Sequence, residues 1–199
     1  MTDDPVIAHS PRLVLASSSP RRRQLLSEAG YRFEVIHPAP DAEDGRLDAE
    51  SAEQMVMRLA RQKAADVARH VPAGIIIGCD TVALCKENVL GKPAHLQDAR
   101  RMLQLMSGQE HQVLSGLCLW KRPSNRVICR SAATSLAMEK LDSRQLEKYL
   151  ETDQWKGKAG GFGYQDSLDW IRIVEGSESN VVGIPLELLA ELLDSLPSD

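Results

Sequence analysis

Apolar runs alternate with amphipathic segments along most of this chain, and the two patterns predict its secondary structure. The run 74–80 contains three consecutive isoleucines, which is typical of a strand buried on both faces. Apolar residues at helical spacing predict long helices over 51–70 and 96–106. Further strands are predicted over 13–16, 31–36, 113–120, 127–138 and 170–174, with 82–84 as a candidate continuation of the strand 74–80. Helices are predicted over 20–29, from Asp142, with Gln145 in the matching capping-box position, and from Pro185. Strands that alternate with helices in this way predict an α/β fold.

Two of the predicted helices carry apolar stripes that indicate which side faces the core. The stripe of helix 96–106 consists of Leu96, Ala99, Leu103 and Met106. The stripe of helix 51–70 consists of Val56, Leu59, Ala60 and Val67. Lys63 falls on this second stripe at helical spacing. A lysine on a core-facing stripe usually extends its ammonium group to the edge of the core, but it would reach a phosphate if the stripe faced a cleft.

Length and composition limit the classes of protein to consider. The chain has 199 residues, 43% of them hydrophobic, which is enough to form the core of one large domain or two small lobes. No apolar run approaches the roughly 20 residues that a membrane span requires. The acidic start Met1-Thr2-Asp3-Asp4 is unlike a signal peptide. We therefore expect a cytoplasmic protein with no membrane partner.

Charge and cysteine content exclude further classes. The formal net charge of −4 argues against a nucleic-acid partner, so a local basic cluster indicates a small anionic ligand. The cysteines have no CxxC spacing, which argues against a zinc site or a disulfide framework. We expect reduced, mostly buried thiols at Cys79, Cys85, Cys118 and Cys129.

A turn rich in serine and arginine joins the first predicted strand to the first predicted helix. Its sequence is Ser17-Ser18-Ser19-Pro20-Arg21-Arg22-Arg23. Ser19 is a good N-cap, and Pro20 suits the first helical position because its missing N–H is not needed there. The free N–H groups of a helix N-terminus favour a bound phosphate, whereas arginines there are unfavourable without an anion. A solvated basic turn is the alternative, but the combined pattern favours phosphate binding.

Acidic residues occur at two places that could meet at one site. Asp80 follows an apolar run, and ligands of open α/β sheets bind beyond the carboxyl ends of strands. A carboxylate there can hold a divalent metal or take a proton from water, and a cap on the next turn is the structural alternative. Asp41, Glu43 and Asp44 form an acidic loop after the second predicted strand. Such loops are usually solvated, but one of these carboxylates with Asp80 could complete a magnesium site.

Two further loops carry polar residues of interest. Lys92 stands between Gly91 and Pro93, and a surface loop lysine is its simplest interpretation. The segment Lys158-Ala159-Gly160-Gly161-Phe162-Gly163-Tyr164-Gln165 is rich in glycine, so its backbone can approach a ligand and Gln165 can bind a base edge. A mobile hinge is the competing interpretation, because the segment is neither a P-loop nor a Rossmann motif.

Taken in order, these segments resemble the Maf family of nucleoside triphosphate pyrophosphatases. Each matching segment is short, but the ordered set runs from residue 13 to about 193. The segments are Leu15-Ala16-Ser17-Ser18-Ser19-Pro20-Arg21-Arg22, Arg58-Leu59-Ala60-Arg61-Gln62-Lys63-Ala64, Gly78-Cys79-Asp80-Thr81, Gly91-Lys92-Pro93, Ser107-Gly108-Gln109-Glu110-His111, the glycine-rich segment that ends at Gln165, and Val182-Gly183-Ile184-Pro185.

The resemblance implies a two-lobed α/β fold with an elongated mixed sheet and a nucleotide cleft between the lobes, similar in shape to inosine triphosphate pyrophosphatases. It implies an N-terminal extension over 1–10 and a single catalytic domain over 11–199, with the second lobe roughly within 110–155. The implied reaction converts a nucleoside triphosphate to the monophosphate and pyrophosphate, with a divalent metal cation such as Mg²⁺ or Mn²⁺. The resemblance is also compatible with a homodimer.

The resemblance further implies a role for each candidate residue. Asp80 matches the proton acceptor, although a metal ligand is an equally open role for it. The phosphate-contacting positions match Ser17, Arg22, Lys63 and Lys92. The partner of Asp80 at the metal would be Glu43 or Asp41. The family often has two adjacent acids there, whereas Ala42 separates them in this chain.

Three base-contacting positions distinguish subgroups of this family. The 7-methyl-GTP subgroup has an aromatic residue, Gln and Glu, whereas the dTTP/UTP subgroup has Arg, Thr and Gln. This chain has Arg21, Thr81 and Gln165 and so resembles the dTTP/UTP subgroup. Gly161-Phe162 stands where Ala-Tyr is usual, which removes a tyrosine hydroxyl from the loop.

The resemblance therefore implies hydrolysis of dTTP and UTP, with house-cleaning of non-standard nucleotides as a related role. One alternative is a pyrophosphatase for other modified nucleotides such as 7-methyl-GTP. A second is a nucleotide-binding regulator of septum formation or cell division. A regulator would tolerate loss of the metal-binding carboxylates, so the presence of Asp80 and the acidic loop favours catalysis.

Overall fold

The protein is built on a seven-stranded mixed sheet, seen in a computed structural model that describes residues 11–43, 45, 47–166 and 168–197. The strand order is β2-β1-β3-β5-β6-β7, and β4 pairs with β3. The strands are β1 (Leu13–Ala16), β2 (Phe33–Ile36), β3 (Gly74–Cys85), β4 (Asn88–Leu90), β5 (Glu110–Arg122), β6 (Arg126–Met138) and β7 (Ile171–Glu175). β1 is parallel to β2 and β3, and the other pairs are antiparallel. The predicted α/β class with a mixed sheet is confirmed.

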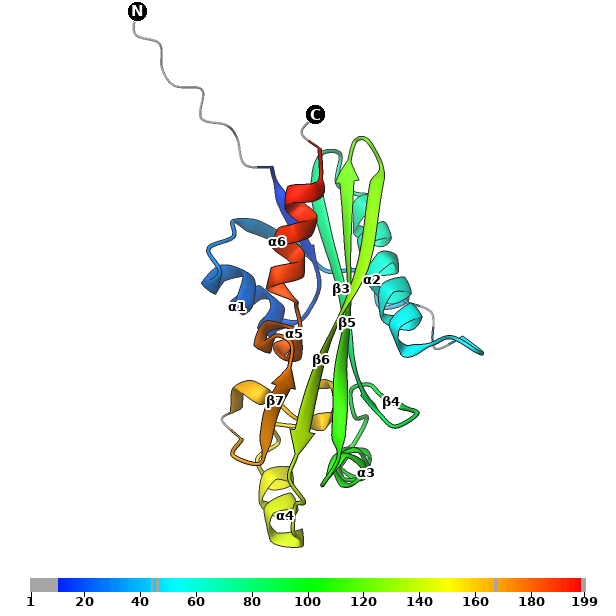
Figure 1. Ribbon diagram of the computed structural model, residues 1–199. Helices are drawn as coiled ribbons and strands as arrows, with labels where there is room; N and C mark the ends of the chain where they lie inside the picture. The colour runs from blue at the N-terminus through cyan, green and yellow to red at the C-terminus, as the bar shows by residue number, and fades with distance from the viewer. Residues whose placement is uncertain (1–10, 44, 46, 167, 198–199) are drawn as a thin grey trace, which may run out of the picture.

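Helices cover both faces of this sheet. They are α1 (Pro20–Glu28), α2 (Ala52–Ala68), α3 (Leu96–Met106), α4 (Ser143–Glu151), α5 (Glu178–Val182) and α6 (Leu186–Ser195), with 3-10 turns η1 (Ala159–Gly161) and η2 (Tyr164–Asp166). Figure 1 shows α2 on one face and α1, α5 and α6 on the other, while α3 and α4 lie at the far end of the elongated sheet. Among the described helices, none combines the length and hydropathy that a membrane span requires.

The apolar side chains gather in separate clusters along the sheet. One cluster joins α1 and α6 to β1, β3 and β5, and another packs α2 on the opposite face. A third fills the end near α3 and α4 and draws residues from Ala83 to Ile171. The predicted second lobe within 110–155 stays a prediction, and the predicted extension over 1–10 lies outside the described residues, as does Asp44.

Local sequence signals explain where the helices begin. Ser19 caps α1 by accepting a hydrogen bond from the backbone N–H of Arg22, and Pro20 takes the first helical position as predicted. Asp142 and Gln145 form the predicted capping box of α4. These caps satisfy backbone N–H groups that a helix leaves without internal partners, so the chain enters each helix at a defined residue.

Two glycines let α2 lie unusually close to the sheet. A Cβ at Gly78 in β3 would lie 2.1 Å from the carbonyl oxygen of Ala60. A Cβ at Gly116 in β5 would lie 2.2 Å from the carbonyl oxygen of Val56. Only glycine permits such an approach of two backbones. This close packing fixes the distance between the sheet and Lys63, which follows Ala60 by three residues in α2.

Two expectations about the elements need correction. Asp80 does not end its strand, because β3 continues through it to Cys85. The strand that ends beside Asp80 is the neighbouring β1. Its last residue, Ala16, pairs with Gly78 of β3, two residues before Asp80. In α3, Leu96 is 44% exposed and Met102 is buried in its place. The helix therefore turns a face slightly different from the predicted stripe toward the core.

Candidate active site

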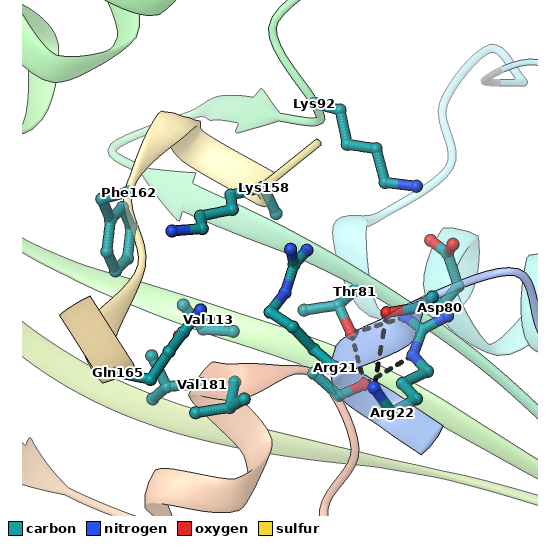
Figure 2. A pocket seen from close by; sticks show the side chains of 14 residues that line it. Arg21, Arg22, Asp80, Thr81, Lys92, Val113, Lys158, Phe162, Gln165 and Val181 are labelled. Atoms are coloured by element: carbon teal, nitrogen blue, oxygen red, sulfur yellow. Dashed lines mark hydrogen bonds between the residues drawn. The ribbon is translucent and has the colours of Figure 1, made fainter. Parts of the chain in front are cut away.

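A cleft opens where β1 ends and β3 continues. Its first part, the serine-side cavity, is lined by Ser17, Ser18, Ser19, Arg22, Pro38, Ala39, Pro40, Glu43, Lys63 and Lys92. Its second part, the glutamine-side cavity, is lined by Ser19, Arg21, Arg22, Asp80, Thr81, Lys92, Val113, Lys158, Ala159, Phe162, Gln165, Val181, Val182 and Gly183 (Figure 2). Ser19, Arg22 and Lys92 line both cavities, so the two form one continuous cleft.

Arg22 is held rigidly at the junction of the two cavities. Its Nε donates to the carbonyl oxygen of Gly183 at 2.7 Å, and its Nη1 donates to Ser17 Oγ at 3.3 Å. Its Nη2 donates to Thr81 Oγ1 at 3.1 Å. The residue is only 8% exposed. Three of its five N–H groups are thus engaged by separate segments, and a planar guanidinium fixed in this way can present the other two to an anion.

Lys63 lies between two carboxylates. Its Nζ is 2.6 Å from Asp80 Oδ1 and 3.1 Å from Glu43 Oε2, and it also donates to the carbonyl oxygen of Cys79 at 3.4 Å. The Lys63 side chain is 10% exposed, so the apolar stripe of α2 does carry this lysine to the edge of a cleft. Asp41 lines a different pocket, on the outer side of α2. Of the two acids expected near Asp80, Glu43 is therefore the one that the structure brings there.

The acidic pair fits a divalent cation that a phosphate ligand completes. Asp80 and Glu43 converge on one ammonium position, which shows that their oxygens can share a cation. Within the described part of the chain, no group of three or more His, Cys, Asp or Glu residues is arranged to hold a metal on its own. Mg²⁺ is typically bound through one or two carboxylates together with substrate phosphates, so two carboxylates are sufficient.

The residues expected at the base all line the glutamine-side cavity. Arg21 donates from Nη2 to the carbonyl oxygen of Gly157 at 2.7 Å. Burial, and then the charge of Arg22, lower the Arg21 pKa, with Asp166 opposing them. Gln165 lies on the opposite wall in η2 (Figure 2). The hydroxyl of Thr81 is already engaged by Arg22 and lies 2.8 Å from Ser115 Oγ.

Sequence comparison assigns the chain to a family. Residues 12–196 match the family described as Maf-like protein. The chain belongs to the Maf-like family. A protein from Rhodopirellula baltica named dTTP/UTP pyrophosphatase is 48% identical over 184 residues, which cover 92% of this chain and 81% of that protein. A protein of the same name from Geotalea uraniireducens is 40% identical, with coverages of 92% and 93%.

The dITP/XTP pyrophosphatase from Mycobacterium abscessus is 13% identical with a TM-score of 0.44, over 94% of this chain and 100% of that chain.

Sequence reasoning missed several contributors to the cleft of this Maf-like protein. Gly183 supplies a carbonyl oxygen that accepts from Arg22, Thr81 and Cys79. Backbone carbonyls have no residue-type signal, so the sequence could not reveal this role. Ser115 lies within β5, where the apolar pattern predicts burial but not the contact with Thr81. Lys158 was visible at the start of the glycine-rich segment, but its ion pair with Asp166 was not.

Lys92 provides a test of the site through pH. Its pKa lies below the ordinary lysine value, first because burial disfavours the charged form and then because Arg22 and Lys63 repel it, with Asp80 partly offsetting them. The ammonium charge is therefore lost at a lower pH than for an exposed lysine. We expect kcat/KM for the nucleotide to fall on the alkaline side, and Lys92→Arg to move that fall to higher pH. If the alkaline fall of kcat/KM stays at the same pH in Lys92→Arg, that fall reports the titration of another group.

Proposed function

We infer that this Maf-like protein is a nucleoside triphosphate pyrophosphatase that hydrolyses dTTP and UTP to the monophosphate and pyrophosphate. The relatives named dTTP/UTP pyrophosphatase, at 48% and 40% identity over most of the chain, supply the substrate class. The continuity of the cleft carries the inference from the geometry. The serine-side cavity, which contains Arg22, Lys63, Lys92 and Glu43, opens directly into the cavity that contains Gln165, which matches a ligand with a triphosphate at one end and a base at the other.

The chemistry of the glutamine-side cavity supports a pyrimidine with carbonyl groups. Arg21 lines this cavity and its guanidinium can only donate hydrogen bonds, whereas the ammonium group of Lys158 is paired with Asp166. Thymine presents the O4 acceptor where cytosine presents an amino donor, and uracil shares the O4 acceptor of thymine. The donors of Arg21 therefore favour uracil and thymine. Gln165 can complete the recognition, because its amide both donates and accepts.

We propose that water attacks the α-phosphorus at the junction of the two cavities. Lys63 binds Asp80 Oδ1, and we assign Asp80 Oδ2 to orient the water and take its proton. The new bond joins the water oxygen to the α-phosphorus, and the bond from that phosphorus to the bridging oxygen breaks. Arg22, Lys92 and the serine turn stabilise the charge on the departing pyrophosphate. Glu43, joined by Asp80 if Asp80 acts as a metal ligand instead of the base, would hold a divalent cation, Mg²⁺ or Mn²⁺, which would polarise phosphate oxygens when bound.

A substrate panel tests this function. We expect pyrophosphate release from dTTP and UTP to exceed that from CTP, 7-methyl-GTP and ITP by roughly tenfold or more in kcat/KM, because a donor-lined site leaves groups unpaired against the wrong base. Dominant turnover of 7-methyl-GTP or ITP would overturn the substrate assignment. Tight nucleotide binding in Mg²⁺ with no product would instead favour the binding-module alternative, a regulator of cell division.

We also propose a cytoplasmic location. Cys118 and Cys129 are free thiols on directly facing positions of β5 and β6. Two thiols so placed are more compatible with a reducing compartment than with one that forms disulfides.

A further inference from the structure

The glycine-rich loop that carries Gln165 is closed by a largely buried ion pair. Lys158 Nζ contacts Asp166 Oδ2, and the two side chains are 10% and 12% exposed. The pair lies across Gly163, where a Cβ would be 2.4 Å from both charged atoms. Asp166 directly follows Gln165 in η2. The ion pair therefore fixes the backbone from which the Gln165 side chain extends.

The same loop is tied to both sides of the cleft. Its Gly157 carbonyl oxygen accepts the hydrogen bond from Arg21 Nη2 at 2.7 Å. The backbone N–H of Gly160 donates to the carbonyl oxygen of Gly91 at 2.9 Å, next to Lys92. Lys158 lies between these two attachment points, and its side chain lines the cavity together with Arg21 and Gln165 (Figure 2). The position of the ion pair thus sets how Arg21 and Gln165 face each other.

Stability alone does not explain a buried pair at this place. Removing two charges from water is costly, and apolar residues of similar volume often stabilise a fold as well or better. A buried pair does fix geometry, because both charges must stay in contact. The neighbouring pair Lys156–Asp153 offers a contrast, since its side chains are 60% and 62% exposed at a distance of 2.7 Å. Such an exposed pair constrains the loop much less.

We propose that Lys158 and Asp166 are positioning residues that make the site select uracil and thymine over cytosine. The amide of Gln165 could present either its carbonyl or its NH₂ group to a base. Uracil and thymine need a donor at O4 and an acceptor at N3–H, whereas cytosine needs the reverse. A freely rotating amide would bind all three bases, so Gln165 adds to the selection only when the loop holds its amide in one orientation. The inference rests on the proposed function, because it presupposes a nucleotide in the cleft.

Binding without turnover gives the most direct test. Affinities for UTP and CTP are measured by calorimetry in the absence of divalent metal, for the wild type, Asp166→Asn and Lys158→Met. We expect the wild-type preference for UTP over CTP to fall roughly tenfold in both variants, the size of effect that misplaced contacts produce. Lys156→Met and Asp153→Asn are the matched controls on the exposed pair and should keep the preference. The charge exchange Lys158→Asp with Asp166→Lys should restore part of it.

Kinetics and hydrogen exchange separate a positioning role from a merely structural one. With metal present, KM for UTP should rise in Asp166→Asn while kcat changes little, and the amides of residues 157–166 should exchange faster. Faster exchange with an unchanged preference for UTP would overturn the proposal and leave the pair a structural element. Unchanged exchange and unchanged preference would also overturn it. A wild type that binds UTP selectively but releases no pyrophosphate would contradict the proposed function only, since the binding comparison would still decide the role of the pair.

Discussion

Asp80→Asn is expected to lower kcat for dTTP by roughly 10²- to 10⁴-fold, the range that a positioned general base contributes. Asn keeps an oxygen that can accept the hydrogen bond from Lys63, which is 2.6 Å from Asp80 Oδ1, so the cleft should stay intact. Nucleotide affinity should change only a few-fold, because the cations Arg22 and Lys92 remain. Pyrophosphate release at saturating dTTP, with affinity measured separately by calorimetry, checks both parts.

A metal titration then separates the two roles open to Asp80. Recovery of Asp80→Asn turnover at high Mg²⁺ would indicate that Asp80 acts mainly as a metal ligand. Turnover that stays low at high Mg²⁺ would support the role of general base. Glu43→Gln is the comparison, since it should raise the Mg²⁺ requirement without abolishing turnover. Asp153→Asn is a surface control of the same residue type, outside the cleft. Near-normal turnover of Asp80→Asn at ordinary Mg²⁺ would remove Asp80 from the reaction centre.

Gly116→Ala is expected to destabilise the fold by about 3 kcal/mol or more, at the upper end of overpacking effects. Its Cβ would lie 2.2 Å from the Val56 carbonyl oxygen and 2.5 Å from the Met57 nitrogen, both backbone atoms. Backbone cannot rotate away as a side chain can, so α2 must move off the sheet. The free energy of unfolding in urea measures the effect.

A matched control for this substitution is Gly91→Ala, because a Cβ at Gly91 meets nothing within 4 Å. Its stability should stay within about 0.5 kcal/mol of the wild type. Any folded fraction of Gly116→Ala should also lose activity, since moving α2 separates Lys63 from Asp80. A Gly116→Ala protein as stable as the wild type would show that α2 does not depend on this close contact.

Local features of this fold could be predicted from the sequence, because they depend on neighbours along the chain. The strand before Ser17, the cap at Ser19 and the capping box at Asp142 are such features, and all are confirmed. Leu96 shows the limit of this reasoning. Its spacing fits the stripe of α3, but where that helix turns its face is set by packing against distant residues, which leave Leu96 exposed.

The candidate site shows the same division between local and distant information. The sequence indicated Asp80 because it follows an apolar run. Its place in the cleft has a different cause, which is that β1 ends at Ala16 while β3 continues beyond it. Whether Asp41 or Glu43 lies near Asp80 depends on the path of a loop, and the spacing of apolar residues does not predict that path. Lys158 and Asp166 are eight residues apart, and only the turns at η1 and η2 bring them together.

Thr81 lines the glutamine-side cavity, and its hydroxyl also accepts one of the hydrogen bonds that hold Arg22. A substitution here that favours a new base would also remove one of the three hydrogen bonds that hold Arg22, the residue that we propose to contact the triphosphate. Substrate preference in this scaffold is therefore hard to change by single steps. A successful switch would need a second change that keeps Arg22 in place, such as one at Ser115, whose Oγ lies 2.8 Å from Thr81 Oγ1. Because one hydroxyl group takes part in both, a change in base preference at Thr81 is expected to lower turnover as well.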